Sequence, residues 1–175
     1  NASRTYVGSE TRIDADAVTV GDGGKVIVWA DEAARFYGHI SATGGEYRGD
    51  GGFAEVSGGF LVFNGAVELI ALRGTNGTLL LDPSNITITD DAAANTEESG
   101  GEFSSNADAA STIQAASIEV LLEAGTDVEV KTADGTATSG DEGDITLLVD
   151  ILVDGGTPTA TLSLNADNDI IFGTN

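Results

Sequence analysis

Acidic side chains are the groups of this sequence with the greatest capacity for chemistry. The chain carries 29 Asp and Glu residues against 7 Lys and Arg, which gives a formal net charge of −22. Carboxylates that lie close together repel one another unless they are splayed apart, protonated or bridged by a cation, and Ca²⁺ prefers oxygen ligands of this kind. Calcium is therefore the one candidate cofactor. The candidate ligands are Asp14, Asp16, Asp22, Asp50, Asp141, Asp144, Asp167 and Asp169.

Two identical strings, GDGG at 21–24 and at 49–52, place an aspartate between glycines. They resemble the calcium-binding nonapeptide repeat but lack its strict tandem period. Asp and Gly are also the residues that tight turns require for purely conformational reasons. The strings are thus open to two interpretations, a calcium site or simple turn chemistry.

The remaining reactive residues do not define a catalytic centre. Paired carboxylates serve glycoside hydrolases, but no pair in this sequence stands out from the others. His39 is the only histidine, and its strand position predicts an outward-facing side chain. Lyases that act on acidic sugars need a basic residue, and the seven basic residues show no clustering along the sequence. We expect no enzyme activity. The basic residues are Arg4, Arg12, Lys25, Arg35, Arg48, Arg73 and Lys131.

The charge and composition exclude several classes of partner. A surface this acidic repels phosphate backbones and anionic lipid heads, so we expect neither nucleic-acid binding nor membrane binding. No apolar run approaches the length that spans a bilayer. The chain has no cysteine, which removes disulfides, thiol catalysis and thiolate metal sites. This composition is compatible with a protein that is exported unfolded.

The elements that would position these side chains are short strands. Apolar residues alternate with a period of two, as in Leu61-Val62-Phe63 and Ile86-Thr87-Ile88, and glycine-rich strings separate the alternating segments. Aliphatic residues on the shared face should form the interior, among them Val18, Val20, Val26, Val28, Ile40, Val56, Leu61, Phe63, Leu122 and Leu164. Strands are predicted near 17–21, 25–30, 35–42, 53–57, 60–64, 78–82, 85–89, 118–123, 127–131, 144–149, 160–164 and 169–173.

An internal repeat indicates how the strands stack. Residues 116–132 align without gaps with residues 158–174, an offset of 42 residues that fits two solenoid coils of about 21 residues each. Roughly eight such coils would form a rod about 40 Å long at the usual strand spacing. A propeller with blades of about 40 residues is the alternative, disfavoured because no blade signature is present. The sequence thus predicts an all-β fold, a right-handed parallel β-helix with one irregular excursion.

The irregular excursion is expected in the segment 91–115, which divides the chain into β-helical segments at 1–90 and 116–175. Residues 91–112 are small, polar and acidic, and they show little periodicity. A short helix is expected around 111–116, with Ser111 or Asp108 as its N-cap.

The amino-acid sequence of residues 14–90 resembles that of one protein family. The strings that carry the resemblance are Gly24 to Asp31, Phe36-Tyr37-Gly38, Gly51 to Gly58 and Gly77 to Ile88, of which LLLDPSNITI at 79–88 is the most specific. They resemble filamentous-haemagglutinin-like exoproteins, the large adhesins that bacteria export by two-partner secretion. The Asn-Pro-Asn motifs of the family's amino-terminal secretion domain are absent, so the resemblance implies a downstream β-helical segment of a longer protein.

The resemblance implies a non-catalytic structural segment of a secreted adhesin or extracellular filament at the bacterial cell surface. Expected partners are end-to-end copies of the chain or the continuation of a longer chain, because a β-helix exposes unpaired strands at both ends. Host-cell or matrix glycans are further candidate partners. The alternatives are a carbohydrate-active β-helix enzyme and a calcium-dependent polysaccharide-binding module.

Overall fold

The computed structural model of the chain describes residues 2–90, 111–132, 143–154 and 159–173. Strands in these ranges pair in parallel and form three sheets. The five-stranded sheet contains, in order, β14 (Leu162–Asn165), β12 (Asp127–Lys131), β9 (Thr78–Pro83), β6 (Phe53–Gly58) and β3 (Lys25–Trp29). The three-stranded sheet contains β2 (Arg12–Asp14), β5 (His39–Ser41) and β8 (Ala66–Glu68). The seven-stranded sheet contains β1 (Arg4–Val7), β4 (Ala33–Phe36), β7 (Phe60–Phe63), β11 (Ser111–Gln114), β10 (Ile86–Thr89), β13 (Ile145–Leu147) and β15 (Ile170–Phe172).

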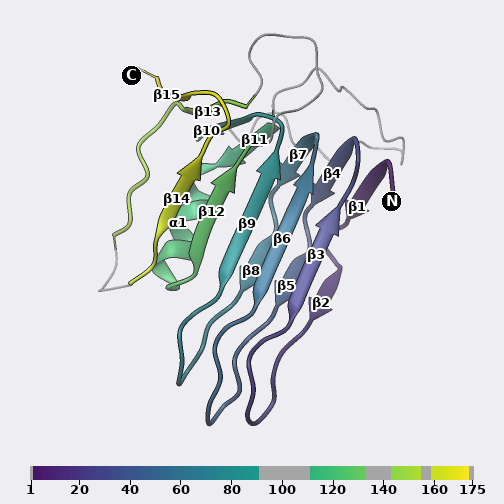
Figure 1. Cartoon of the computed structure of the whole chain (residues 1–175), viewed down its shortest axis with the longest axis vertical. Helices are drawn as coiled ribbons and strands as arrows, with labels where there is room; N and C mark the ends of the chain where they lie inside the picture. Colours follow the sequence, from purple (N-terminus) through teal and green to yellow (C-terminus); the bar gives the residue numbers. More distant parts are fainter. Residues whose placement is uncertain (1, 91–110, 133–142, 155–158, 174–175) are drawn as a thin grey trace.

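These sheets wind as a β-solenoid, which confirms the predicted fold class. In Figure 1 the strands of the five-stranded sheet run upward in front, and the chain returns behind them through the other two sheets. Each turn steps leftward from the N-terminus, so the winding is right-handed. The five-stranded sheet contributes one strand per turn, which gives five turns.

The length of a turn differs from the prediction. Lys25 pairs with Phe53, and Phe53 pairs with Thr78, so successive turns advance by 28 and 25 residues. The predicted coils of about 21 residues, and with them the eight coils, are therefore wrong. Five turns at the usual strand spacing extend about 24 Å along the axis.

The 42-residue repeat is not a structural repeat. Val128 of β12 pairs with Leu162 of β14, an offset of 34 residues. The segments that the repeat would superpose include a helix in one copy and strand β14 in the other. The alternation of apolar residues that the two segments share therefore does not correspond to one shared structure.

A helix replaces the strand predicted at 118–123. Helix α1 (Ala115–Glu123) buries Ala115, Ile118, Leu121 and Leu122, which follow the helical period rather than a period of two. The helix begins after Gln114, not at Ser111, which lies in β11. Gly125, with φ of +87°, ends the helix, and the N–H groups of Gly125 and Thr126 donate to the carbonyls of Leu122 and Leu121.

Other strand predictions are confirmed with shifted bounds. The predicted strand at 35–42 is divided between β4 and β5, and the structure adds β1, β2, β8 and β11. The strand predicted at 17–21 is wrong, since that segment contributes only an isolated bridge between Val20 and Arg48. Strand β11 lies within the segment assigned to the excursion, and residues 91–110 of that segment lie outside the described ranges.

The core is a continuous column of apolar side chains inside the turns, most of them aliphatic. Phe36 and Phe63 are fully buried and stack with ring centroids 5.7 Å apart and planes 8° from parallel. Most of the predicted interior is confirmed, but Val18 and Val20 are 85% and 62% exposed. The predicted interior residues that are buried or half-buried are Val26, Val28, Ile40, Val56, Leu61, Phe63, Leu122 and Leu164.

The seven-stranded sheet departs from sequence order at one place. Strand β11 lies between β7 and β10, although β10 comes first in the chain. The side-chain hydroxyl of Ser111 accepts a hydrogen bond of 2.9 Å from the N–H of Leu61. The segment 91–110 therefore connects two neighbouring strands whose positions in the sheet are reversed.

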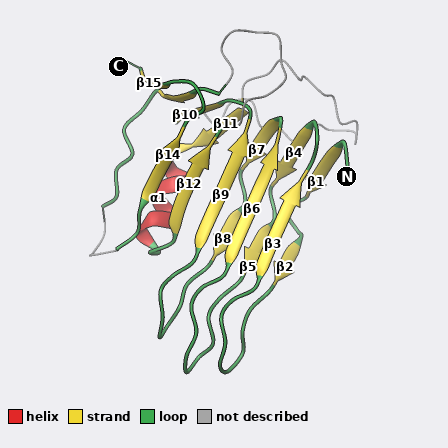
Figure 2. Ribbon diagram, viewed as in Figure 1, coloured by secondary structure: helices red, strands yellow, loops and turns green. Residues whose placement is uncertain are grey.

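Three loops project beyond the sheets and stack on one another (Figure 2). They are residues 15–24, 42–52 and 69–77, and we call them the fin. The N–H of Gly21 donates to the carbonyl of Arg48 at 2.9 Å, and the N–H of Gly51 donates to the carbonyl of Thr75 at 2.8 Å. The fin thus continues the turn-to-turn hydrogen bonding of the sheets.

Candidate functional site

The predicted calcium ligands that the structure describes form no group of three or more around one point. Asp14 forms an ion pair with Arg12, with 2.6 Å between Oδ1 and Nε, and Asp141 lies outside the described ranges. Among the described residues there is no group of three or more His, Asp or Glu side chains that could hold a metal ion. The calcium hypothesis stays a prediction, which the experiment in the Discussion addresses.

Several of the predicted aspartates instead bond to the main chain of the following turn. Asp22 Oδ1 accepts a hydrogen bond of 2.8 Å from the N–H of Asp50, and Asp50 Oδ1 accepts one of 2.8 Å from the N–H of Thr75. Asp144 Oδ1 accepts from the N–H of Asp169 at 3.0 Å. We call this arrangement the carboxylate ladder. It satisfies loop N–H groups that no neighbouring strand reaches.

Three side chains that were not among the predicted calcium ligands also accept hydrogen bonds from distant main-chain N–H groups. Asp127 Oδ1 accepts from the N–H of Thr161 at 2.7 Å, and Glu119 Oε1 accepts from the N–H of Leu152 at 2.7 Å. Asn85 Oδ1 accepts from the N–H of Asp144 at 3.2 Å. Asp167 differs, because it is exposed and its carboxylate has no hydrogen-bond partner among the described residues.

Asp16 makes the densest set of these bonds. Its Oδ1 accepts from the Ser41 hydroxyl at 2.7 Å, the Thr43 N–H at 2.7 Å and the Thr43 hydroxyl at 3.0 Å. Burial by itself raises the pKa of Asp16, but the hydrogen bonds from Thr43 and Ser41, together with the charge of Arg12, lower that pKa below its ordinary value. The carboxylate is therefore held in its charged form.

The glycines of the two GDGG strings serve the close packing of the fin. Gly49 has φ of +143°, and a Cβ on it would collide with the carbonyl oxygen of Gly21. A Cβ on Gly51 would collide with the carbonyl oxygen of Leu69. Backbone packs directly on backbone here, which supports the turn-chemistry interpretation of these strings.

His39 lies half-buried on β5, and its ring is hydrogen-bonded to Arg12. Arg12 Nη1 lies 2.8 Å from His39 Nδ1. Because a guanidinium only donates hydrogen bonds, Nδ1 is the acceptor. The contact joins β2 to β5, and among the described residues no carboxylate or nucleophile forms a hydrogen bond with the ring.

A second acidic group lies on the outward face of the five-stranded sheet. Asp82 of β9 is paired with Lys131, with 3.8 Å between Oδ2 and Nζ, while its buried Oδ1 has no hydrogen-bond partner in the described structure. Burial is the main cause that raises the pKa of Asp82; Lys131 opposes the shift, and the charges of Glu55 and Glu129 add to it. Sequence reasoning missed this group because its members lie on three different strands.

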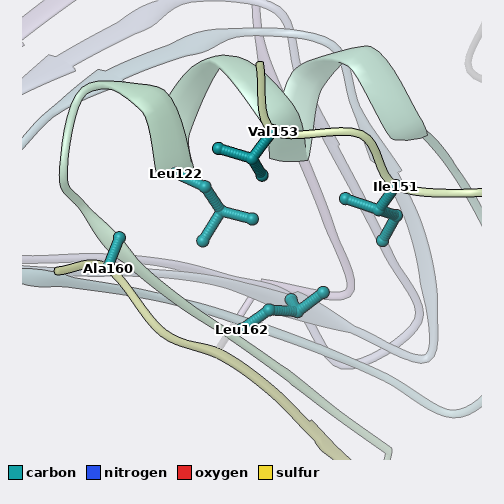
Figure 3. Close-up of a pocket in the computed structure, with 5 residues that line it drawn as sticks. All are labelled: Leu122, Ile151, Val153, Ala160 and Leu162. Carbon is teal, nitrogen blue, oxygen red and sulfur yellow. The ribbon is translucent and has the colours of Figure 1, made fainter. Parts of the chain in front are cut away.

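An apolar pocket opens at the C-terminal end of the solenoid. Its volume is about 430 Å³, and its lining combines helix α1, the segment 150–154 and strand β14. Figure 3 shows the five side chains around the space, none of which offers a polar group. They are Leu122, Ile151, Val153, Ala160 and Leu162. The pocket is the interior of the last turn, and no further strand of the described ranges covers it.

No protein-family model and no curated protein matches this chain. The resemblance to filamentous-haemagglutinin-like exoproteins therefore stays a prediction. In the described ranges, no helix has the length and apolar character needed to cross a membrane.

Proposed function

We propose that this chain is a non-catalytic structural segment of a secreted bacterial surface adhesin or extracellular filament. The observation that carries the proposal is the pair of open ends of an otherwise continuous solenoid. Strands β3 and β14 are the first and last strands of the five-stranded sheet, and each is paired on one side only within the described residues. A parallel sheet of this kind is extended by any strand that matches its edge.

The C-terminal end offers apolar surface as well as strand edges. Ile170 and Phe172 align with Ile145 and Leu147 of the previous turn, which face the core, yet Phe172 is 72% exposed. The open apolar pocket lies at the same end. A further turn laid on this end would bury both, at about 25 cal/mol per Å² of apolar surface.

The N-terminal end carries three basic residues on its outermost strands. Arg4, Arg12 and Lys25 lie on β1, β2 and β3, one in each sheet. The last turn has no basic residue in its described ranges, 143–154 and 159–173, and its acids include Asp150, Asp154, Asp167 and Asp169. The first turn, residues 2–30, also carries Glu10, Asp14, Asp16 and Asp22. Its near balance of charge makes contact with an acidic C-terminal end less repulsive than contact between two C-terminal ends.

The partner on each end is a copy of the chain or the continuation of a longer chain. Head-to-tail contact between copies is heterologous and does not close, so it produces linear filaments. Location at the cell surface and binding of host or matrix glycans belong to the same proposal and rest on the family resemblance of residues 14–90.

The test is a fusion that covers one end. Two copies joined in tandem through a flexible linker should unfold in one transition at a higher temperature than the single chain, because the internal ends would then be paired. Two independent transitions at the single chain's temperature, measured by calorimetry, would contradict the proposal.

A carbohydrate-active enzyme remains the second candidate, and one observation favours it. Asp82 has a raised pKa and lies beside Glu55 and Glu129, and glycoside hydrolysis uses one protonated and one ionised carboxyl group. Release of reducing sugar from a panel of polysaccharides, abolished in Asp82→Asn, would establish this function in place of the structural one.

A further inference from the structure

The basic residues of this acidic chain divide into two groups. Five of the seven contact a carboxylate or an aromatic ring of the same chain. Arg48 and Arg73 are exposed on the fin, and their side chains have no ion pair, hydrogen bond or ring contact among the described residues. The five that are engaged are Arg4 with Glu32, Arg12 with Asp14, Lys131 with Asp82, Lys25 over Phe53 and Arg35 over Phe60.

Arg48 and Arg73 are neighbours across two turns, although 25 residues separate them. Asp50 Oδ1 accepts the N–H of Thr75, and a Cβ on Gly74 would collide with the carbonyl oxygen of Gly49. Both contacts have the same 25-residue offset, which places the two arginines side by side at about 4.8 Å between adjacent turns. The 4.8 Å is the spacing of the two main chains; guanidinium groups that converge repel each other unless they splay apart or an anion lies between them.

Exposed apolar side chains accompany the arginines. Tyr47 is 67% exposed and Leu72 is 70% exposed, and the same offset makes them neighbours. The N–H of Tyr47 donates to the carbonyl of Thr19 at 3.0 Å, so the Tyr47 backbone is fixed within the stack. The Tyr47 ring can pack against a ring of a ligand. The guanidinium groups of the two arginines can at the same time bind a negatively charged group of that ligand.

The acids of the fin leave the arginine pair accessible. Asp22 and Asp50 each use Oδ1 to accept a main-chain N–H, and Glu46 forms no ion pair with Arg48 or Arg73. At physiological salt, charges farther away than about 8 Å are largely screened, whereas the summed charge of −22 still repels a dense polyanion. A ligand with one isolated carboxylate fits this field better than a nucleic acid or a heavily sulfated polymer.

We propose that Arg48 and Arg73 bind the carboxylate of an acidic sugar, such as a sialic or uronic acid, while the ring of Tyr47 packs on the sugar. An arginine fork matches the two oxygens of a carboxylate, and hydrogen bonds between charged groups are the stronger ones. The inference rests on the proposed adhesin role and names its ligand class and its site.

The test measures binding of sialyllactose to the whole chain by ligand-observed NMR, with lactose as the uncharged control. Arg48→Gln/Arg73→Gln should weaken binding roughly tenfold or more, the loss expected for one charged hydrogen-bonding pair. Arg35→Gln/Lys131→Gln, on β4 and β12, makes the same change in net charge away from the fin and from the outermost strands, and it should leave binding unchanged. Tyr47→Ala should weaken binding of sialyllactose but not of acetate.

Three results would overturn the inference. The first is absence of sialyllactose binding, or equal binding of lactose. The second is equal loss of binding in the Arg35→Gln/Lys131→Gln control. The third is that Arg48→Gln/Arg73→Gln leaves sugar binding intact and alters sedimentation, since the pair would then contact the acidic surface of a second copy. None of these results bears on the ends of the solenoid, so the structural role is tested separately.

Discussion

Replacement of Asp50 separates a hydrogen-bonding role of the carboxylate ladder from a calcium-binding role. Asp50 Oδ1 accepts the N–H of Thr75 at 2.8 Å, and the N–H of Asp50 donates to Asp22 Oδ1 at 2.8 Å. Asp50→Ala removes the first bond and leaves the second in place. Asp50→Asn keeps an acceptor oxygen but loses the negative charge that a calcium ligand needs.

The expected loss of stability in Asp50→Ala is small but measurable. A hydrogen bond to a charged group contributes about 1.5–3 kcal/mol. Because Asp50 and Thr75 are both exposed, water replaces part of the lost bond, and we expect about 1 kcal/mol. For a chain of this size, that loss lowers the melting temperature by about 2–4 °C.

The assay is urea denaturation followed by circular dichroism, in chelator and in millimolar calcium. Asp31→Ala serves as the matched control, because Asp31 is exposed and its carboxylate has no partner among the described residues. We expect Asp50→Ala to be less stable than the control in both buffers and Asp50→Asn to lie near the parent. The reasoning is refuted if calcium stabilises the parent and both Asp50 variants lose that stabilisation equally, since the carboxylate would then act as a metal ligand.

Three further predictions concern the core and the pH dependence. Phe63→Ala should cost about 3–5 kcal/mol in urea denaturation, because it removes a fully buried ring that stacks on Phe36; a loss below about 1 kcal/mol would show that the stack is not packed as described. The pKa of Asp82 is raised, so its stabilising contribution is present below about pH 3.9 and is lost as the pH rises through the folded-state value. Asp82→Asn should therefore be at least as stable as the parent at neutral pH, and a clearly less stable variant would contradict this. The pKa of Asp16 is lowered, so its contribution is present above about pH 3.9 and is lost as the pH falls through the folded-state value; Asp16→Asn should flatten the acid limb of the stability curve, and an unchanged limb would argue against it.

The alternation of apolar residues was sufficient to predict the fold class. Strands β6, β7 and β9 were located within one or two residues, because period-two patterns with glycine at their ends have few alternatives. The alternation does not encode the length of a turn, which depends on how far the loops project. The two GDGG strings are 28 residues apart, which equals the offset between β3 and β6. Their spacing therefore predicts the length of this turn better than the 42-residue repeat does.

A short helix was expected around 111–116, but the helix lies at Ala115–Glu123, where a strand was predicted because the sequence satisfies both periods. Ile118, Val120 and Leu122 alternate as in a strand, but Val120 is exposed in the structure while Leu121 is buried. Gly125 two residues after the helix was a recognisable stop signal. Helix-forming residues followed by a glycine therefore predict the structure of this segment better than the alternation of apolar residues does.

The candidate sites could be predicted only in part. The acids were recognised as the reactive groups, but their role depends on main-chain N–H groups of the next turn, which no sequence pattern marks. The arginine pair was missed for a related reason. Arg48 and Arg73 look unclustered along the chain, and only the 25-residue advance of that turn brings them together.

The most direct test of the structural role is the assembly state of the chain at high concentration. Ile170→Lys/Phe172→Lys places two charges on the edge strand β15, and Leu72→Lys/Val120→Lys makes the same change at exposed positions of the third and fourth turns. We predict that the parent and the Leu72→Lys/Val120→Lys control form linear particles in electron micrographs and sediment faster as concentration rises. The Ile170→Lys/Phe172→Lys variant should remain monomeric and be less stable. A parent that is strictly monomeric, with the edge-strand variant equally stable, would show that the end is already closed and would contradict the proposal.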